Sequence, residues 1–262
     1  MPSLSEKTFA SYFKNLLTTD QPGNTGIDDV LARIQDGDGN DSAILLSDDA
    51  VSIKPVDNDG AGVFQILSTA SASALRVDTS SPMKVVVGES QVHATTLFKE
   101  MGLYDFGPAS AGYHYPLIAN TMFPASGADN FASDADWNNG DDPASTLDVS
   151  GLSEPENAIA IYWYIEDNIT LDSVRFMAYT EGGSVVLNFH LEAYTISSIG
   201  DLSGGLTHAS ASVTMATAAV KNNTFSLDEA DIDAGKVVIG FVENVTDTSS
   251  ISVSFNIKYH IR

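Results

Sequence analysis

Residues 251–261 alternate between apolar and polar side chains without interruption. Successive side chains of a β-strand point to opposite faces, so this pattern predicts a strand with one buried face and one solvated face. Residues 185–194 repeat the pattern, with Leu187 and Phe189 alternating with Asn188 and His190. The two segments favour an antiparallel sheet that covers a core on one side. The apolar set of the last strand is Ile251, Val253, Phe255, Ile257, Tyr259 and Ile261.

Further strands are predicted near residues 169–179, 210–220, 224–228 and 236–245. Their spacing and turn residues are typical of an antiparallel sandwich or jelly roll, which we assign to residues 157–262. A strand predicted at 158–165 is apolar or aromatic on both faces. One face can cover the core, and the other needs a second partner. We therefore predict a subunit interface anchored by Tyr162 and Tyr164.

Residues 25–95 read as short strands separated by turns such as Asp57-Asn58-Asp59-Gly60. Strands this short cannot enclose a core alone, so copies from neighbouring chains are expected to complete them around a threefold axis. The alternative is a small β meander. Residues 96–156 form a junction with an acidic loop, which Trp137 is expected to pin. The predicted fold is thus mainly β, with a β-rich trimeric shaft and a C-terminal sandwich.

Residues 3–19 carry the one predicted helix, within an N-terminal segment 1–24. Ser3 and Glu6 have the spacing of a capping box, and Gln21-Pro22-Gly23-Asn24 ends the pattern. Large apolar side chains follow at helical spacing and must be buried. They pack either on the chain's own domain or symmetry mates, or on a larger particle as an attachment helix. These residues are Phe9, Tyr12, Phe13, Leu16 and Leu17.

The net charge of −23, from 35 acidic and 12 basic residues, would repel nucleic acid and anionic membranes. We therefore expect no nucleic-acid or membrane partner. The absence of cysteine excludes disulfides and thiolate catalysis, so robustness must come from packing or oligomerisation. The N-terminus does not have the pattern of a signal peptide, and no apolar run approaches the ~20 residues of a membrane span.

No hydrolase, nucleotide-binding or zinc-protease motif is present, and we predict no enzyme activity and no cofactor. The histidines at 93, 114, 190, 208 and 260 are scattered; His190 and His260 fall on polar strand faces, and no metal site is predicted. Calcium is the one ion considered. Asp36, Asp38 and Asn40 begin like an EF-hand loop, but the pattern then fails and a hairpin turn explains them better. Two acidic groups are interpreted as solvated loops: Asp134, Asp136, Asp141 and Asp142, and Asp228, Glu229, Asp231 and Asp233.

The stretch from Gly26 to Asp49 contains Asp-Gly-Asp-Gly-Asn-Asp-Ser-Ala-Ile-Leu-Leu-Ser-Asp-Asp. It resembles the "dGxGNxSaLxLSxD" opening of fibre proteins of marine tailed bacteriophages. The segments Leu75-Arg-Val-Asp-Thr-Ser and Val85-Val-Val-Gly resemble their "lxVDTtnskVxVG" shafts. Residues 97–106, 113–120 and 235–244 are similar to the body of the same group. The resemblance implies a structural role in the virion, supplies no site residues, and fits either a tail or a head location.

The sequence thus predicts a homotrimeric phage fibre subunit that is exposed on the particle. Its N-terminus would bind other virion proteins of the tail or capsid, and its C-terminal domain would contact a host surface glycan or protein. Aromatic rings stack on sugars, and Trp137, Tyr179 and Tyr194 are the candidate ligand contacts. The alternatives are a head fibre or capsid decoration protein without a specific ligand, and a carbohydrate-binding module or secreted adhesin.

Overall fold

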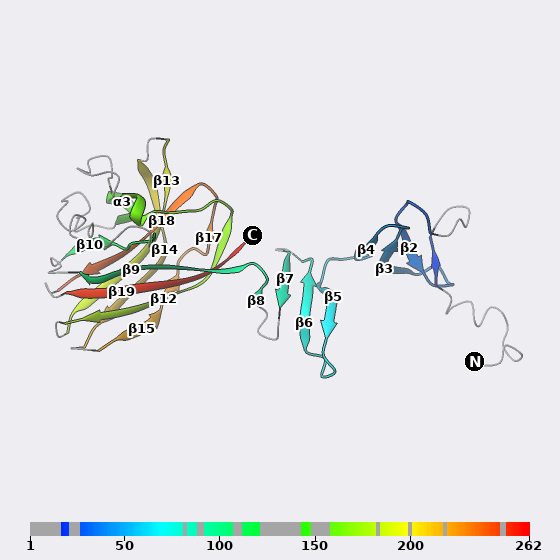
Figure 1. The fold of residues 1–262 in the computed structure, drawn as a ribbon, viewed down its shortest axis with the longest axis horizontal. Helices are drawn as coiled ribbons and strands as arrows, with labels where there is room; N and C mark the ends of the chain where they lie inside the picture. Colours follow the sequence, from blue (N-terminus) through cyan, green and yellow to red (C-terminus); the bar gives the residue numbers. More distant parts are fainter. Residues whose placement is uncertain are drawn as a thin grey trace, which may run out of the picture. The chain divides into compact units, whose positions relative to one another are not determined.

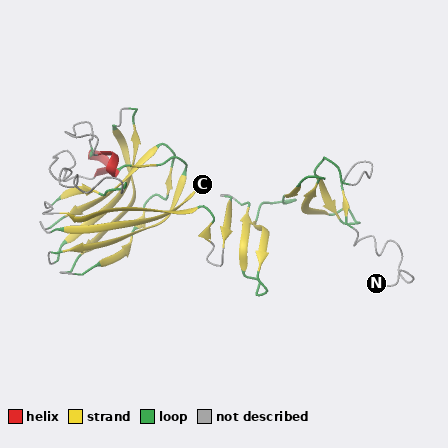
Figure 2. Ribbon diagram, in the orientation of Figure 1, coloured by secondary structure: helices red, strands yellow, loops and turns green. Residues whose placement is uncertain are grey.

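Strands make up most of the regular structure of the computed structural model (Figures 1 and 2). It describes residues 17–20, 27–80, 83–87, 92–106, 112–120, 143–147, 158–181, 184–198, 201–216, 219–246 and 250–262. The chain divides into two compact units, Met1–Ala94 and Thr95–Arg262. The prediction of a mainly β protein is confirmed. The described helices, α3 (Pro143–Thr146) and α4 (Ala158–Ile161), are single turns.

In its described residues, the first unit contains two four-stranded antiparallel sheets. One follows the chain order through β1 (Thr18–Thr19), β2 (Ala32–Gln35), β3 (Asp41–Leu46) and β4 (Val51–Ile53). The other follows it through β5 (Ala61–Leu67), β6 (Ser73–Asp78), β7 (Lys84–Val87) and β8 (Val92–His93). Both are meanders formed within one chain, which is the alternative given for residues 25–95.

The turn between β2 and β3 is closed by Asp36, whose carboxylate accepts hydrogen bonds from the backbone N–H groups of Asp38 and Asn40, each at 2.9 Å. The amide of Asn40 also donates to it at 2.8 Å. Gly39 has φ of +81°, a conformation that glycine adopts readily. These contacts account for the residues that begin like an EF-hand loop.

The second unit is a sandwich of two antiparallel sheets. One sheet has the order β15 (Lys221–Thr224), β12 (Ile169–Thr180), β19 (Ile251–Ile261) and β9 (Thr96–Phe106), with β17 (Asp231–Ile232) beside β12. The other has the order β10 (Tyr113–Pro116), β18 (Lys236–Asn244), β13 (Val186–Ile196), β14 (Leu202–Thr214) and β16 (Ser226–Leu227), with β11 (Trp163–Tyr164) beside β18.

The pairing of the eight main strands is nested. The first, β9, pairs with the last, β19; β10 pairs with β18, β12 with β15, and β13 with β14. This is the pattern of one long hairpin rolled up so that its two arms form both sheets, which defines a jelly roll. The prediction of a C-terminal antiparallel, jelly-roll-like sandwich is therefore confirmed. The sandwich begins earlier than predicted, because β9 and β10 from the expected junction are integral strands.

The core between the sheets is centred on four phenylalanine rings. Phe176 and Phe189, from opposite sheets, are stacked with their centroids 4.2 Å apart. Phe225 and Phe255 contact each other edge-on at 4.9 Å. The apolar sets predicted for 185–194 and 251–261 face this core, except that Tyr259 is partly buried and Ile261 is exposed. Burial of these alternating side chains fixes the register of both sheets.

The predicted strand at 158–165 is wrong, because residues 158–161 form the helical turn α4 and strand pairing is confined to β11. Ile161 and Ala160 pack on Tyr194, Ile239 and Phe241, on the outer face of the sheet. A short apolar run gives no periodicity that separates a buried helix from a buried strand. The same packing buries β18 on both faces.

The predicted helix at 3–19 cannot extend to its expected end, because Thr18 and Thr19 form β1 and pair with Gln35 and Ile34. β-branched threonine favours a strand. The remainder of that prediction, with Phe9, Tyr12, Phe13 and Leu16, lies outside the described residues. Leu17 is exposed. None of the helices in the described part of the chain has the length and apolar character that a membrane-spanning helix requires.

Candidate functional site

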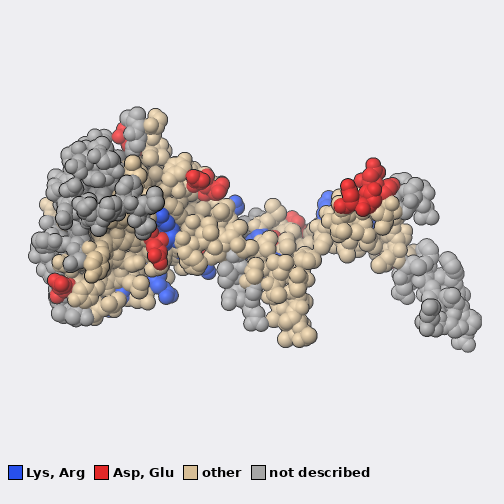
Figure 3. All heavy atoms as spheres, in the orientation of Figure 1, with Lys and Arg blue, Asp and Glu red and all other residues tan. Residues whose placement is uncertain are grey.

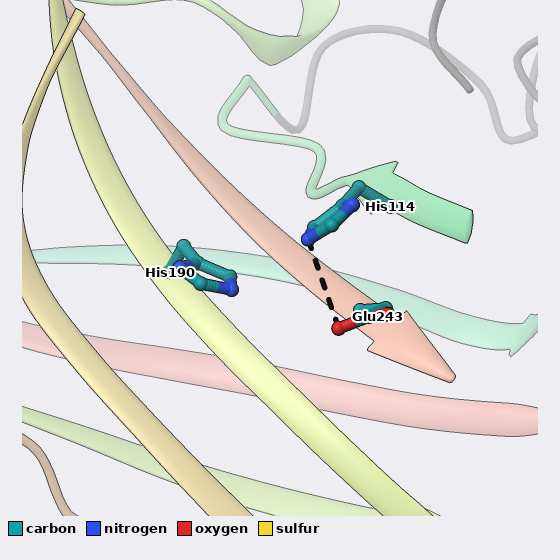
Figure 4. A group of neighbouring side chains, drawn as sticks. All are labelled: His114, His190 and Glu243. Carbon is teal, nitrogen blue, oxygen red and sulfur yellow. Dashed lines mark ion pairs between the residues drawn. The ribbon is translucent and has the colours of Figure 1, made fainter. Parts of the chain in front are cut away.

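Three polar side chains from neighbouring strands lie together on the outer face of the β10–β18–β13 sheet (Figure 4). They are His114 of β10, Glu243 of β18 and His190 of β13. Their candidate ligand atoms all lie within 4.8 Å of one another. Imidazole nitrogens and a carboxylate oxygen in this arrangement can share one divalent metal ion.

Strand register explains why these residues meet. His114 is directly opposite Glu243, and Glu243 is directly opposite Asn188. His190 follows Asn188 by two positions, so it points to the same face. On this strand the polar residues alternate with Leu187, Phe189 and Leu191, which are fully buried in the core. Core packing of one face therefore sets the position of the site on the other.

Hydrogen bonds and ion pairs orient the three side chains. Nε2 of His114 lies 3.8 Å from Oε2 of Glu243, and the same oxygen accepts a hydrogen bond of 2.7 Å from the amide of Asn188. Nδ1 of His190 lies 3.7 Å from Oε1 of Glu192. Glu192 is fully buried, and the hydroxyl of Thr207 donates to that oxygen at 3.0 Å. The two imidazole rings are tilted, with centroids 5.2 Å apart.

The sequence did not point to this cluster. His190 was interpreted as a surface residue, whereas it is partly buried beside Glu192, and His114 is buried. His260 of β19 is also buried, and its Nδ1 lies 3.0 Å from Oδ1 of Asp172 in β12, the neighbouring strand of the same sheet. The only local signal is a charged or imidazole group inside strongly apolar segments, as in Tyr113-His114-Tyr115 and Val242-Glu243-Asn244. Their proximity depends on strand pairing, which sequence spacing does not give.

A second feature is a shallow hollow of about 600 Å³ on the outer face of β9, β19 and β12. Tyr104, Met177 and Tyr179 line it together with the polar side chains of Glu100 and Ser254. Tyr104 is 89% exposed. Gly102 also lines the hollow, and a Cβ there would lie 2.8 Å from the carbonyl oxygen of Val253, so no larger residue fits.

Tyr179 and Tyr194, two of the three predicted ligand contacts, therefore lie on different sheets. Tyr179 lies in this hollow. Tyr194 is buried on the other sheet, where its hydroxyl donates to the carbonyl of Pro143 at 2.9 Å, and it offers no face to a ligand. Trp137 lies outside the described residues.

The two predicted interface residues, Tyr162 and Tyr164, lie in different surroundings in the second unit. Tyr164 is exposed and lines a smaller hollow of about 210 Å³ with Leu97 and Ile261, beside the contact between the rings of Trp163 and Tyr259. Tyr162 is partly buried against α4 and its neighbours. Burial, helped by the charge of Asp201, raises the pKa of its hydroxyl to about 12, so it stays protonated.

Of the acidic groups, Asp134, Asp136, Asp141 and Asp142 lie outside the described residues. In the other group, Arg262 pairs with Asp231 and Asp233, each at 3.0 Å. The hydroxyl of Ser210 donates to Asp228 at 2.9 Å. Asp228, Asp231 and Asp233 thus contact protein groups in the described part of the chain.

No family model and no curated protein matches this chain. Among solved structures, it is similar to a chain of the T13 IBDV viral particle, described as a missing link in icosahedral virus evolution, with a TM-score of 0.21 and 9% identity. The match covers 84% of this chain and 48% of that chain, so this chain spans about half its length.

Proposed function

We propose that this chain is a structural, non-enzymatic subunit of a virus particle and forms a homotrimeric fibre. The observation that carries the proposal is an apolar face on the β5–β7 sheet. Phe64 pairs with Val77 and Val77 with Val85; Ile66 pairs with Leu75 and Leu75 with Val87. Directly paired residues share a face. Ile66 is 52% exposed and Val87 48% exposed in the single chain.

The β2–β4 sheet has the same character. Leu46 pairs with Ala32 and Val51, and Ile44 pairs with Ile53. Val51 is 70% exposed. Apolar faces of this kind mark interaction surfaces. Three copies arranged around an axis, each turning its apolar face inward, would bury both sheets, whereas one copy leaves them in water.

The exposed charges favour this arrangement. Acidic side chains gather over the β1–β4 sheet (Figure 3), where Asp38, Asp41, Asp48 and Asp49 are exposed. Carboxylates outside and apolar groups inside would keep trimers in solution and prevent them from associating further. The jelly roll adds a compact unit of a type found in capsid and lectin domains. A fold alone does not define a function.

For the second unit we propose contact with a host surface glycan at the hollow that contains Tyr104 and Tyr179. Their rings would stack on a pyranose, while Glu100 and Ser254 would accept or donate hydrogen bonds. Tyr179→Ala should reduce adsorption of the purified trimer to host cells, whereas Tyr194→Phe should leave it unchanged. Equal adsorption by both variants would remove the glycan proposal and favour a decoration protein that binds no ligand.

The trimer is tested by analytical ultracentrifugation of the full chain at micromolar concentration. A single species of three times the 27.7 kDa chain mass is expected. A folded monomer or dimer would overturn the proposal. Antibody labelling of intact particles then tests the virion role: label on the tail or on the capsid distinguishes a tail fibre from a head fibre, and absence from particles would favour a secreted adhesin.

A further inference from the structure

We propose that His114, His190 and Glu243 bind one divalent transition-metal ion, with Zn²⁺ as the expected metal. Two imidazoles and one carboxylate form a ligand set that zinc accepts, and a fourth position remains for water. The nitrogen ligands disfavour Ca²⁺ and Mg²⁺, which require oxygen. This inference is independent of the trimer, because the ligands belong to one jelly-roll unit.

The distances suit a site that tightens on binding. Ligand atoms about 2.1 Å from a tetrahedral zinc ion lie about 3.4 Å from one another. Nε2 of His114 and Oε2 of Glu243 are 3.8 Å apart, and all three ligand atoms lie within 4.8 Å of one another. His114 is buried, whereas His190 and Glu243 are partly buried. Small rotations of the latter two side chains about their χ angles would close these gaps without moving the backbone, which strand pairing holds in place.

The surrounding groups match those that orient metal ligands. A metal-bound histidine commonly has a carboxylate near its second ring nitrogen, and ligating carboxylates are themselves hydrogen-bonded. Here buried Glu192 lies 3.7 Å from Nδ1 of His190. Asn188 donates to Glu243 at 2.7 Å. The carboxylates of Glu192 and Glu243 also supply negative charge that a cation would balance.

The role of the ion would be structural. β10 is a four-residue edge strand, and the residues after it join the two sheets. Leu117 donates to Gly240 in one sheet, and Ile118 forms a bridge with Gly102 in the other. A metal bound to His114, Glu243 and His190 would cross-link this edge strand to two interior strands. In a chain without cysteine, such a cross-link would take the place of a disulfide.

The test uses the full chain, stripped with a chelator and titrated with ZnCl₂ by isothermal titration calorimetry. One zinc ion per chain, a Kd in the micromolar range or lower, and a rise in Tm of about 5 °C at saturation are expected. His190→Gln and Glu243→Gln should weaken binding at least about a hundredfold, and Asn188→Ala about tenfold or more, because it removes a positioning group.

The matched control is His260→Gln, which alters another histidine–carboxylate pair, in the opposite sheet, and should bind zinc as the wild type does. Circular dichroism confirms that each variant is folded. If Glu243→Gln does not fold, the visible spectrum of the Co²⁺-loaded wild type and of His190→Gln gives a separate readout of ligation. Binding weaker than millimolar in the wild type, unchanged binding in His190→Gln, or equal loss in His260→Gln would overturn the proposal.

Discussion

Replacing Ile66 by aspartate tests whether the apolar face of the β5–β7 sheet holds chains together. Ile66 lies on the strand at one side of this face and is 52% exposed in the single chain. Full burial of such a side chain contributes about 1.5–3 kcal/mol, so covering the exposed half contributes about 1 kcal/mol. The residue occurs once in each chain, and a trimer therefore loses about 3 kcal/mol when it is removed.

That loss alone corresponds to about a hundredfold in the association constant. The introduced carboxylates would increase it, since burying each one costs several kcal/mol and the three would lie close to one another in the proposed trimer. The single chain should tolerate the change, because the position is half in water. Ile66→Asp is therefore expected to be folded by circular dichroism and to dissociate at concentrations where the wild type is trimeric.

Gln65→Asp is the matched control. It introduces the same charge one residue away, on the opposite face, where Gln65 pairs with Arg76 and is exposed. Sedimentation velocity over a dilution series measures both variants beside the wild type. If Ile66→Asp sediments as Gln65→Asp does, the apolar face is not buried between chains, and the reasoning that led to a trimer is refuted.

Three further predictions concern the jelly roll. Phe189→Ala should lower the free energy of unfolding by about 3–5 kcal/mol, because Phe189 is fully buried and contacts three other phenylalanine rings. Urea denaturation measures this loss, and a loss below about 1 kcal/mol would contradict the packing. Tyr194→Phe should cost about 1 kcal/mol, the contribution of one buried hydrogen bond to Pro143, and no measurable loss would show that this bond does not hold α3. Burial lowers the pKa of His208 below its ordinary 6.5, so the unfolded chain takes up a proton first as the pH falls. The stability that this histidine contributes is complete above pH 6.5 and declines below it. In thermal melts between pH 7 and pH 5, the Tm of His208→Gln should therefore fall less steeply with pH than the Tm of the wild type. Parallel curves of Tm against pH would exclude His208 as a cause of the decline.

Alternation was the part of the sequence that predicted structure best. Residues 251–261 form β19 as expected, because a strand with one buried face has to repeat every second residue. Where small residues interrupt the alternation, the predicted strand bounds were displaced along the chain. The strand expected at 210–220 is β14 at Leu202–Thr214, in a segment rich in serine, glycine and alanine. At 158–161 an apolar run was consistent with either element, and packing on Tyr194 and Phe241 decided for a helical turn.

The candidate site was beyond sequence reasoning for a different reason. His114, His190 and Glu243 belong to three strands that the jelly roll brings side by side, and no fixed spacing in the chain reports such pairing. The sequence also did not distinguish the surroundings of Tyr179 from those of Tyr194. Both are tyrosines in predicted strands, yet one lines a surface hollow and the other is fully buried. The difference depends on which face of each sheet is covered from outside, and that is a property of the assembled fold.

The two proposals address the same physical requirement at different places. A chain with no cysteine and a net charge of −23 needs stabilising interactions that do not rely on disulfides and that resist its own charge repulsion. The first unit has apolar faces that a single copy leaves in water, so association between chains is the means available to it. The second unit has a complete core, but its β10 edge is short, and a metal ion bound there would hold the edge within one chain. Because the residues concerned belong to different units and different sheets, their effects should be separable. Removing zinc should lower the melting temperature of the jelly roll and leave the trimer intact, whereas Ile66→Asp should dissociate the trimer and leave the zinc stoichiometry unchanged.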